Sequence, residues 1–193
     1  MLELALEKFP VRTILSDEAP CSIRLLELGD EVPFRDFHTV IPDREQLFLR
    51  NQIKDGTLFR EWLADQESEE HLPLLAFVDG RIAGMGYLNQ RLGGWKRHIG
   101  VVTFLTHPDY RGLGLINLLL EEIIEMARHC GLTKLESELN GDRVSAIEAL
   151  ATSGFKEVVR IPDYVRDMKA NHHDYVLMGM ELVASFENLG AGD

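Results

Sequence analysis

Cysteine is scarce in this sequence, which contains only Cys21 and Cys130. The two residues lie far apart, with no His or Cys at metal-ligand spacing, and this argues against a disulfide framework and against a zinc site. The sequence also lacks an apolar stretch of bilayer-spanning length, and residues 1–10 lack the basic start and continuous apolar run of a signal peptide. We therefore expect a cytoplasmic protein that holds no metal and contacts no membrane.

Basic residues are also few in relation to acidic ones. The chain has 20 Lys and Arg residues against 32 Asp and Glu residues, which gives a formal net charge of −12. Such a surface repels the phosphates of nucleic acids and favours cationic small molecules such as amines, although many cytoplasmic proteins share this balance and bind no cation. The composition therefore argues against a nucleic-acid partner and is compatible with an amine ligand.

The length and apolar content fit one domain. The chain has 193 residues, of which 45% are hydrophobic, and this is enough to fill a core beneath a single sheet. We predict the domain over residues 12–184, preceded by an N-terminal extension at 1–11 and followed by a glycine-bearing tail at 185–193.

Strand-like runs alternate with stretches of helical spacing along this domain. Strands are expected at 11–15, 21–26, 74–78, 81–88, 99–106, 135–140, 155–160 and 175–183. Two or three helices are expected within 30–66, and one each at 116–127 and 143–153. Asp79-Gly80 has the chemistry of a tight hairpin turn. The order predicts a mixed sheet flanked by helices, in the α/β or α+β class.

The segment 107–116, with the sequence HPDYRGLGLI, joins a predicted strand to a predicted helix. Free amides at a helix N-terminus bind phosphate oxygens, and glycine lets a ligand approach the backbone closely. An isolated Gly-x-Gly is more often an ordinary turn. The segment lacks the Lys-Ser or Lys-Thr of a nucleoside triphosphate loop and the three-glycine spacing of a dinucleotide fold. Its pattern indicates a pyrophosphate cradle of another kind.

This segment resembles the central motif of the GNAT superfamily of N-acetyltransferases, which reads Arg or Gln, two residues, Gly, one residue, then Gly or Ala. Arg111 and Gly114 match its fixed positions and Gly112 stands at a variable one, whereas Ile116 departs from the small residue usual at the last position. The resemblance implies that acetyl-CoA is the co-substrate. Its pyrophosphate would be held by Arg111 and by the amides of Gly112, Leu113, Gly114, Leu115 and Ile116.

A second signature of the family is similar to residues 143–155, where Ala146, Ile147, Gly154 and Phe155 match in register. Arg143 stands where an Asn often contacts the pantetheine arm of CoA, and Leu150 stands where many members have a tyrosine acid. Two correctly spaced motifs are more specific than either alone. The resemblance spans about residues 12–183 and implies a GNAT fold, with a mixed, mostly antiparallel sheet of six to eight strands flanked by four or five helices.

Transfer of an acyl group to an amine requires a neutral amine, a polarised carbonyl and a stabilised leaving thiolate. The resemblance places the oxyanion donor at a backbone amide near Leu105 or Thr106. A lysine-like amine has a pKa of about 10.4, so a base must take its proton. The glutamate that many relatives use is absent from residues 100–103. We name His98 and Glu138 as candidate bases and Tyr164 as a candidate acid, although His98 and Glu138 also fit exposed, solvated side chains.

Two functions remain open on the sequence alone. The chain is an N-acyltransferase that moves acetyl from acetyl-CoA to a primary amine of a small molecule or protein, or it is a catalytically weak acyl-CoA-binding sensor with the same fold. An α/β hydrolase is disfavoured because no Gly-x-Ser-x-Gly elbow occurs. The acceptor, the acyl length and the oligomeric state carry no signature, although homodimers are common in the family.

Overall fold

The structure is a computed structural model that describes residues 6–42, 45, 57–64 and 70–182. Its eight strands form one sheet in the order β1-β2-β3-β4-β5-β6-β8-β7. The strands are β1 (Val11–Ile14), β2 (Pro20–Leu25), β3 (His71–Val78), β4 (Arg81–Asn89), β5 (Ile99–Thr106), β6 (Lys134–Asn140), β7 (Lys156–Arg166) and β8 (His172–Glu181). The α-helices of the described residues are α2 (Glu31–Val40), α4 (Thr57–Ala64), α5 (Leu115–His129) and α6 (Val144–Thr152).

The strand pairing confirms the predicted mixed, mostly antiparallel sheet. Every neighbouring pair is antiparallel except β5 with β6. The hairpin between β3 and β4 turns at Asp79 and Gly80, whose φ angles of 48° and 75° are both positive. This is the geometry that a two-residue hairpin turn needs, and it explains why an Asp-Gly pair indicates a turn at this point of the sequence.

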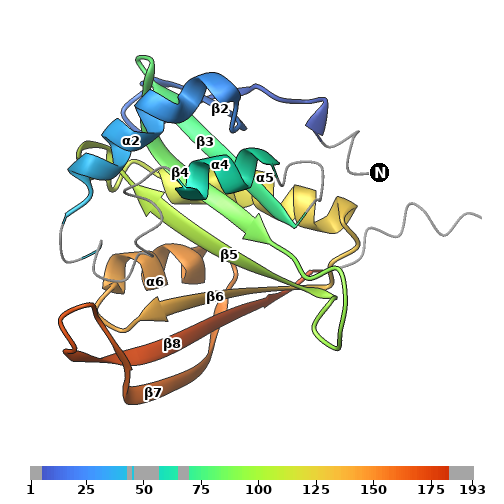
Figure 1. Cartoon of the computed structure of the whole chain (residues 1–193), viewed down its shortest axis with the longest axis vertical. Coiled ribbons are helices and arrows are strands. Elements are labelled where there is room, and N and C mark those ends of the chain that lie inside the picture. The colour runs from blue at the N-terminus through green and yellow to red at the C-terminus, as the bar shows by residue number, and fades with distance from the viewer. Residues whose placement is uncertain (1–5, 43–44, 46–56, 65–69, 183–193) are drawn as a thin grey trace, which may run out of the picture.

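Helices cover both faces of the sheet (Figure 1). On one face, α5 packs its buried residues Leu119, Leu120 and Ile123 into the larger apolar cluster. On the other, α2 and α4 contribute Phe34 and Trp62 to a second cluster that also contains Leu105 from β5. Val102 and Phe104 of β5 belong to the first cluster and Leu105 to the second, so side chains that point to opposite faces of β5 lie in different layers, as the pleat of a strand requires.

Strand β5 separates from β6 soon after the two strands begin to pair. The parallel ladder joins only Ile99–Val101 to Lys134–Glu136. At the next step the hydroxyl of Ser137 donates a hydrogen bond to the carbonyl oxygen of Val102, at 3.0 Å. Beyond that point the two strands diverge, toward the left of Figure 1. The separation opens the sheet at the carboxyl ends of both strands.

Strand β7 is longer than the sequence pattern predicts. The apolar run ends at residue 160, ahead of Pro162 and Asp163, but β7 continues to Arg166 across an irregularity between Ile161 and Val165. Asp163 adopts a φ of 53° there, so the chain bulges and then resumes its pairing with β8. Strand β8 likewise begins at His172 rather than at residue 175.

The predicted C-terminal tail and most of the segment 43–56 lie outside the described residues. Within the described ranges, no helix combines the length and the apolar character needed to cross a membrane.

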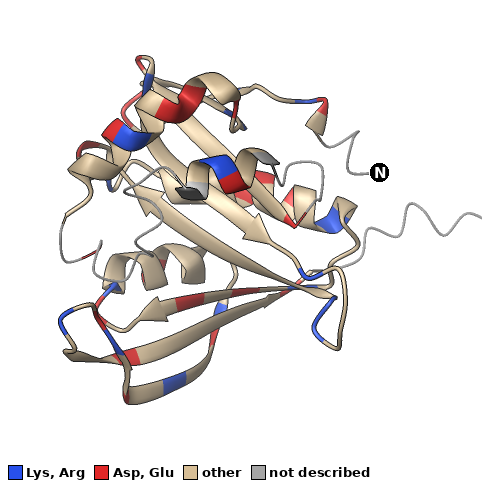
Figure 2. Cartoon of the chain, viewed as in Figure 1, with Lys and Arg blue, Asp and Glu red and all other residues tan. Residues whose placement is uncertain are grey.

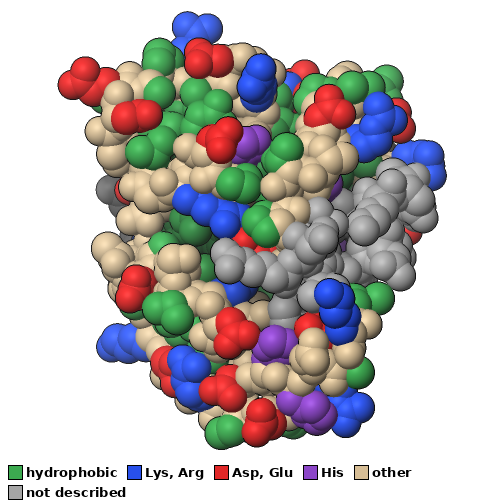
Figure 3. Space-filling view, turned by 90° about the vertical axis from the view of Figure 1, so that its left-hand side faces the viewer, with side chains coloured by type: hydrophobic (Ala, Val, Ile, Leu, Met, Phe, Trp, Pro, Cys, Tyr) green, Lys and Arg blue, Asp and Glu red, His purple; other side chains and the backbone are tan. Residues whose placement is uncertain are grey.

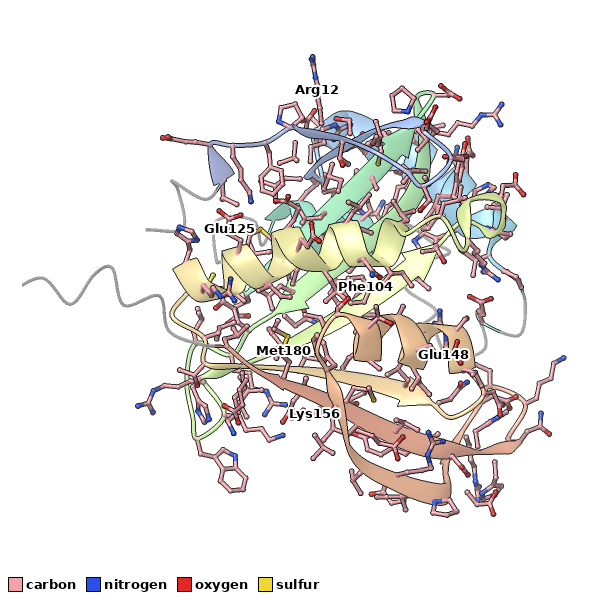
Figure 4. All side chains as sticks on the ribbon, turned by 180° about the vertical axis from the view of Figure 1, so that it is seen from behind. Arg12, Phe104, Glu125, Glu148, Lys156 and Met180 are labelled. Carbon is pink, nitrogen blue, oxygen red and sulfur yellow. The ribbon has the colours of Figure 1, made fainter. Side chains whose placement is uncertain are left out.

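Close packing of α5 against β4 predicts a stability effect at Gly86. A Cβ atom there would lie 2.8 Å from the ring of Phe104 and 2.9 Å from Cδ1 of Ile123; Figure 4 labels Phe104 on the face that α5 covers. We expect Gly86→Ala to lower the free energy of unfolding by about 1–3 kcal/mol, because overpacking a close-packed core forces neighbouring groups to move. Urea denaturation measures the effect.

Gly93→Ala is the matched control, since no atom lies within 4 Å of a Cβ placed at that loop residue. A loss of stability at Gly93 as large as that at Gly86 would contradict overpacking as the cause.

Candidate functional site

The junction between β5 and α5 forms a turn built around two glycines. After a short 3₁₀ turn at Pro108–Tyr110, Gly112 and Gly114 adopt φ angles of 77° and 79°, and Gly114 is the N-cap of α5. The backbone amide of Ser16 donates to the carbonyl oxygen of Leu113 at 3.2 Å, which ties the loop to the turn between β1 and β2. The first amides of α5 lack intrahelical partners by geometry and point out of the helix end. The loop therefore presents backbone donors on a fixed framework.

A cavity of about 600 Å³ lies beside this junction. It faces the viewer's side in Figure 3, where basic and acidic side chains gather in a hollow between the upper and lower parts of the molecule. Its wall contains most of the residues predicted to bind the cofactor, namely Thr106, Arg111, Gly112, Gly114, Leu115, Ile116 and Arg143. The side chain of Leu113 packs against the apolar core. The structure thus brings the two sequence motifs to one cavity.

Two guanidinium groups place positive charge in this cavity, whose wall also contains the carboxylates of Glu45, Asp142 and Asp167. Arg111 follows β5 and donates to the carbonyl oxygen of Thr106 at 3.3 Å. Arg143 follows β6, and burial lowers the pKa of its side chain, with a smaller lowering from nearby Arg111. Together with the N-terminal end of the α5 dipole, these groups form a site suited to an anion.

Glu45 neutralises part of that charge in the free protein. Its carboxylate lies 2.9 Å from Arg111 and 3.6 Å from Arg143, and its side chain is only 11% exposed. Sequence reasoning missed this glutamate, because its partners are distant in the chain and no local motif surrounds it.

A second cavity, of about 460 Å³, occupies the separation between β5 and β6. Its wall includes Leu105 from β5, Glu138 from β6 and Leu150 from α6. Because the β5–β6 ladder ends at Val101, the β5 residues beyond Val102 are free to line this cavity, and Thr103, Phe104 and Leu105 do so. The two cavities adjoin each other in one depression, because their walls share Glu45, Ile116, Asn140, Arg143 and Ala146.

Asn140 carries a buried oxygen that needs a hydrogen bond. The residue is 9% exposed, and within the described part of the chain its Oδ1 atom has no hydrogen-bond partner. A buried acceptor left unpaired costs about 1–3 kcal/mol. An N–H group of a ligand in the shared depression would remove that cost.

Glu138 and Tyr175 present polar groups to the second cavity. Glu138 is exposed on β6, whose acidic positions are coloured in Figure 2, and Tyr175 comes from the neighbouring strand β8. Burial raises the pKa of the Tyr175 phenol, and the carboxylates of Glu138 and Glu136 raise it further. Sequence reasoning missed Tyr175, because only the pairing of β6 with β8 brings it to the cavity.

Two other predicted side chains do not line either cavity. Tyr164 is 65% exposed, and its ring packs 5.8 Å from that of Tyr175 without lining the cavity itself. His98 is exposed in the turn before β5, where its carbonyl oxygen accepts bonds from Thr133 and Lys134. At 3.3 Å per residue, it stands roughly 23 Å along the strand from Leu105. Of the three predicted catalytic side chains, Glu138 lines one of the two cavities, whereas His98 and Tyr164 line neither.

The adjacent histidines His172 and His173 bind different partners. His172 Nδ1 lies 3.0 Å from the carbonyl oxygen of Asp163, whereas His173 Nδ1 lies 2.7 Å from Asp142 and its Nε2 lies 3.4 Å from Asp167. No group of metal-ligating side chains was found among the described residues. His173 therefore links the β6–α6 loop to the turn between β7 and β8 at the rim of the first cavity.

Known proteins share both sequence features and the fold with this chain. A model of the GNAT acetyltransferase family matches residues 37–155. A GNAT-family acetyltransferase from Streptococcus pneumoniae has a similar structure, with a TM-score of 0.67 and 25% identity over 84% of this chain and 99% of its own. A Salmonella typhimurium protein solved with its cofactor acetyl-CoA gives a TM-score of 0.68, with 17% identity over 90% of this chain and 98% of its own. The ribosomal-protein-S18-alanine N-acetyltransferase from Escherichia coli gives a TM-score of 0.66, with 20% identity over 88% of this chain and 98% of its own.

The His173 link predicts a pH-dependent contribution to stability. Its hydrogen bond to Asp142 raises the pKa of His173 above the usual 6.5. A raised folded-state pKa means that the stabilisation is fully present below about pH 6.5 and is lost as the pH rises through the folded-state value. We expect His173→Gln to lower Tm more at pH 5.5, where His173 carries its charge, than at pH 8.5.

Thermal scans of both proteins across that range measure the difference. His172→Gln serves as the control, because its Nδ1 contact is to a backbone carbonyl rather than to a carboxylate. An equal Tm deficit for His173→Gln at every pH would contradict a charged link.

Proposed function

The chain belongs to the GNAT acetyltransferase family, and we propose that it transfers an acetyl group from acetyl-CoA to a primary amine by direct attack. The observation that carries the proposal is the convergence of Arg111, Arg143 and the N-terminus of α5 on one cavity that continues into the separation between β5 and β6. The acceptor would be a small molecule or a protein amino group, and the protein would act in the cytoplasm.

The residues around the first cavity fit a CoA pyrophosphate. At Gly112 no atom lies within 4 Å of the position that a Cβ would take, so a phosphate can approach the backbone there. Amides from Gly112 to Ile116 would donate to its oxygens, and Arg111 and Arg143 would supply charge-assisted bonds. Ile116 packs its side chain partly against the apolar core, which supports the use of its amide despite the branched side chain.

The buried oxygen of Asn140 fits the next part of the cofactor. The pantetheine arm carries amide N–H groups, and one of them would satisfy Oδ1 of Asn140 in the wall shared by both cavities. The thioester would then lie in the separation of the strands, where a backbone amide near Leu105 or Thr106 would polarise its carbonyl.

Glu138 is the residue we assign to the acceptor. Its carboxylate would hold the ammonium form of the amine and take its proton, directly or through water, before attack on the thioester carbon. The amine nitrogen then forms the new C–N bond as the C–S bond breaks, and the second proton lost by the nitrogen passes, directly or through water, to the departing thiolate, so that CoA leaves as the thiol. Tyr175 places a phenol in the same cavity. We prefer it to Tyr164 for a polar role near the acceptor, because Tyr164 projects outward with 65% exposure.

One observation favours the alternative of a binding protein with little turnover. Leu150, at the position where many relatives have a tyrosine acid, is 1% exposed and belongs to the apolar core. It cannot donate a proton. A protein of this second kind would bind acetyl-CoA through the same cradle and release no CoA with any amine.

Charge reversal at Arg111 tests the cofactor assignment. We expect Arg111→Glu to weaken acetyl-CoA binding by about a hundredfold or more, because a guanidinium that attracts phosphate is replaced by a carboxylate that repels it. Isothermal titration measures Kd. Arg97→Glu makes the same charge change on an exposed loop residue and should leave Kd within about twofold of wild type. Equal effects of the two variants would contradict the assignment.

Removal of the Glu138 carboxylate tests the acceptor side. With an amine that releases CoA from the wild-type protein, we expect Glu138→Gln to lower kcat by about a hundredfold and to leave the Kd for acetyl-CoA unchanged. Glu121→Gln on the exposed surface of α5 is the control. If Glu138→Gln kept the wild-type kcat, another group would have to accept the proton.

A further inference from the structure

The carboxylate of Glu45 occupies the space between the two arginines of the first cavity. Its Oε1 atom lies 2.9 Å from Nη2 of Arg111, and its Oε2 atom lies 3.6 Å from Nη2 of Arg143. One oxygen thus faces each guanidinium. The arginines follow different strands, so this carboxylate connects the loop after β5 to the loop after β6.

A carboxylate and a phosphate compete for the same partner. Both are anions that accept charge-assisted hydrogen bonds from the planar guanidinium group, and Arg suits each of them for this reason. Glu45 is 11% exposed on its side chain, so its contacts are screened less than those of a surface pair. The contact is therefore strong enough to affect a ligand that needs the same arginines.

The free protein benefits from this carboxylate. Burial and the neighbouring Arg111 both lower the pKa of Arg143, whereas Glu45 opposes them. Two like charges held close together in a partly buried cavity repel each other, and a carboxylate between them offsets that repulsion. An anionic ligand that takes the arginines must therefore replace an interaction that the protein already makes.

We propose that Glu45 is an internal competitor for the anion site and thereby determines which ligands the cavity accepts. This inference rests on the proposed function, because it takes the arginines to be the groups that bind the CoA pyrophosphate. A ligand with a diphosphate carries enough charge to displace the carboxylate. A ligand that lacks phosphate gains nothing from the arginines and leaves Glu45 in place. Glu45 thus lowers affinity for CoA while it favours CoA over small, weakly charged anions.

The competing explanation is that Glu45 positions the arginines for the ligand and is not displaced. The two explanations predict opposite changes on removal of the charge. If Glu45 competes, Glu45→Gln releases both guanidinium groups and anionic ligands bind more tightly. If Glu45 positions them, the variant binds these ligands more weakly.

Isothermal titration with three probes separates these outcomes. For Glu45→Gln we expect the Kd of acetyl-CoA to fall by about five- to tenfold, which corresponds to about 1–1.4 kcal/mol. The Kd of inorganic pyrophosphate should fall as well. S-acetylpantetheine, which carries no phosphate, should show a much smaller change between the wild type and the variant than either phosphate ligand. An unchanged or higher Kd for the two phosphate ligands would overturn the proposal.

Glu148→Gln is the matched control for net charge. Glu148, labelled in Figure 4, lies exposed on α6 and is absent from the walls of both cavities. A gain in affinity equal to that of Glu45→Gln would show a general charge effect and overturn the proposal. Circular dichroism and Tm of each variant establish that it is folded.

If the proposed function is wrong, the titrations give a different result. In that case wild type would not bind acetyl-CoA, yet the pyrophosphate titrations still test Glu45 directly. Tighter pyrophosphate binding by Glu45→Gln would support competition at the arginines even then, and equal or weaker binding would reject it.

Discussion

The early end of the β5–β6 ladder is the constraint on which the rest of the site depends. Pairing stops after Ile99–Val101 and Lys134–Glu136, so the sheet opens at the carboxyl ends of two parallel strands. Parallel strands require a crossover, and α5 supplies it. The loops after β5 and β6 consequently leave the sheet at the same edge. This arrangement brings Arg111 and Arg143 to one cavity although they are distant in sequence.

The positive groups in this cavity are opposite in sign to the net charge of the whole chain. The sequence carries a formal net charge of −12, which repels anionic ligands at long range, whereas the helix end and two guanidinium groups attract them at short range. Glu45 extends the acidic character of the chain into the cavity itself. Recognition of a CoA-like anion is then a local effect of geometry and partial burial.

Short sequence patterns are sufficient to predict the turns and helices whose geometry depends on residues close together in the chain. Asp79-Gly80 requires only its own backbone geometry to form a turn, and the apolar spacing of Leu119, Leu120 and Ile123 reports one face of α5 directly. The glycine junction before α5 is equally readable, because a strand end, a turn and a helix start follow one another in the chain. The family resemblance extends these observations to the order of the sheet.

Features that arise from distant contacts are not predictable in the same way. Tyr175 reaches the second cavity only through the pairing of β8 with β6, and Glu45 meets its arginines only in the folded chain. His98 has an imidazole suited to a base, but its place at the opposite end of β5 separates it from the cavity. A residue type can suggest chemistry, whereas only the register of the strands decides which side chains share a cavity.

Transfer of the acetyl group is tested most directly by the release of CoA thiol from acetyl-CoA, followed with a thiol reagent, across a broad panel of primary amines. We expect at least one amine to release CoA in step with formation of its N-acetyl product, identified by mass spectrometry. Tight binding of acetyl-CoA with no amine-dependent release across the panel would contradict an acetyltransferase and favour a binding protein.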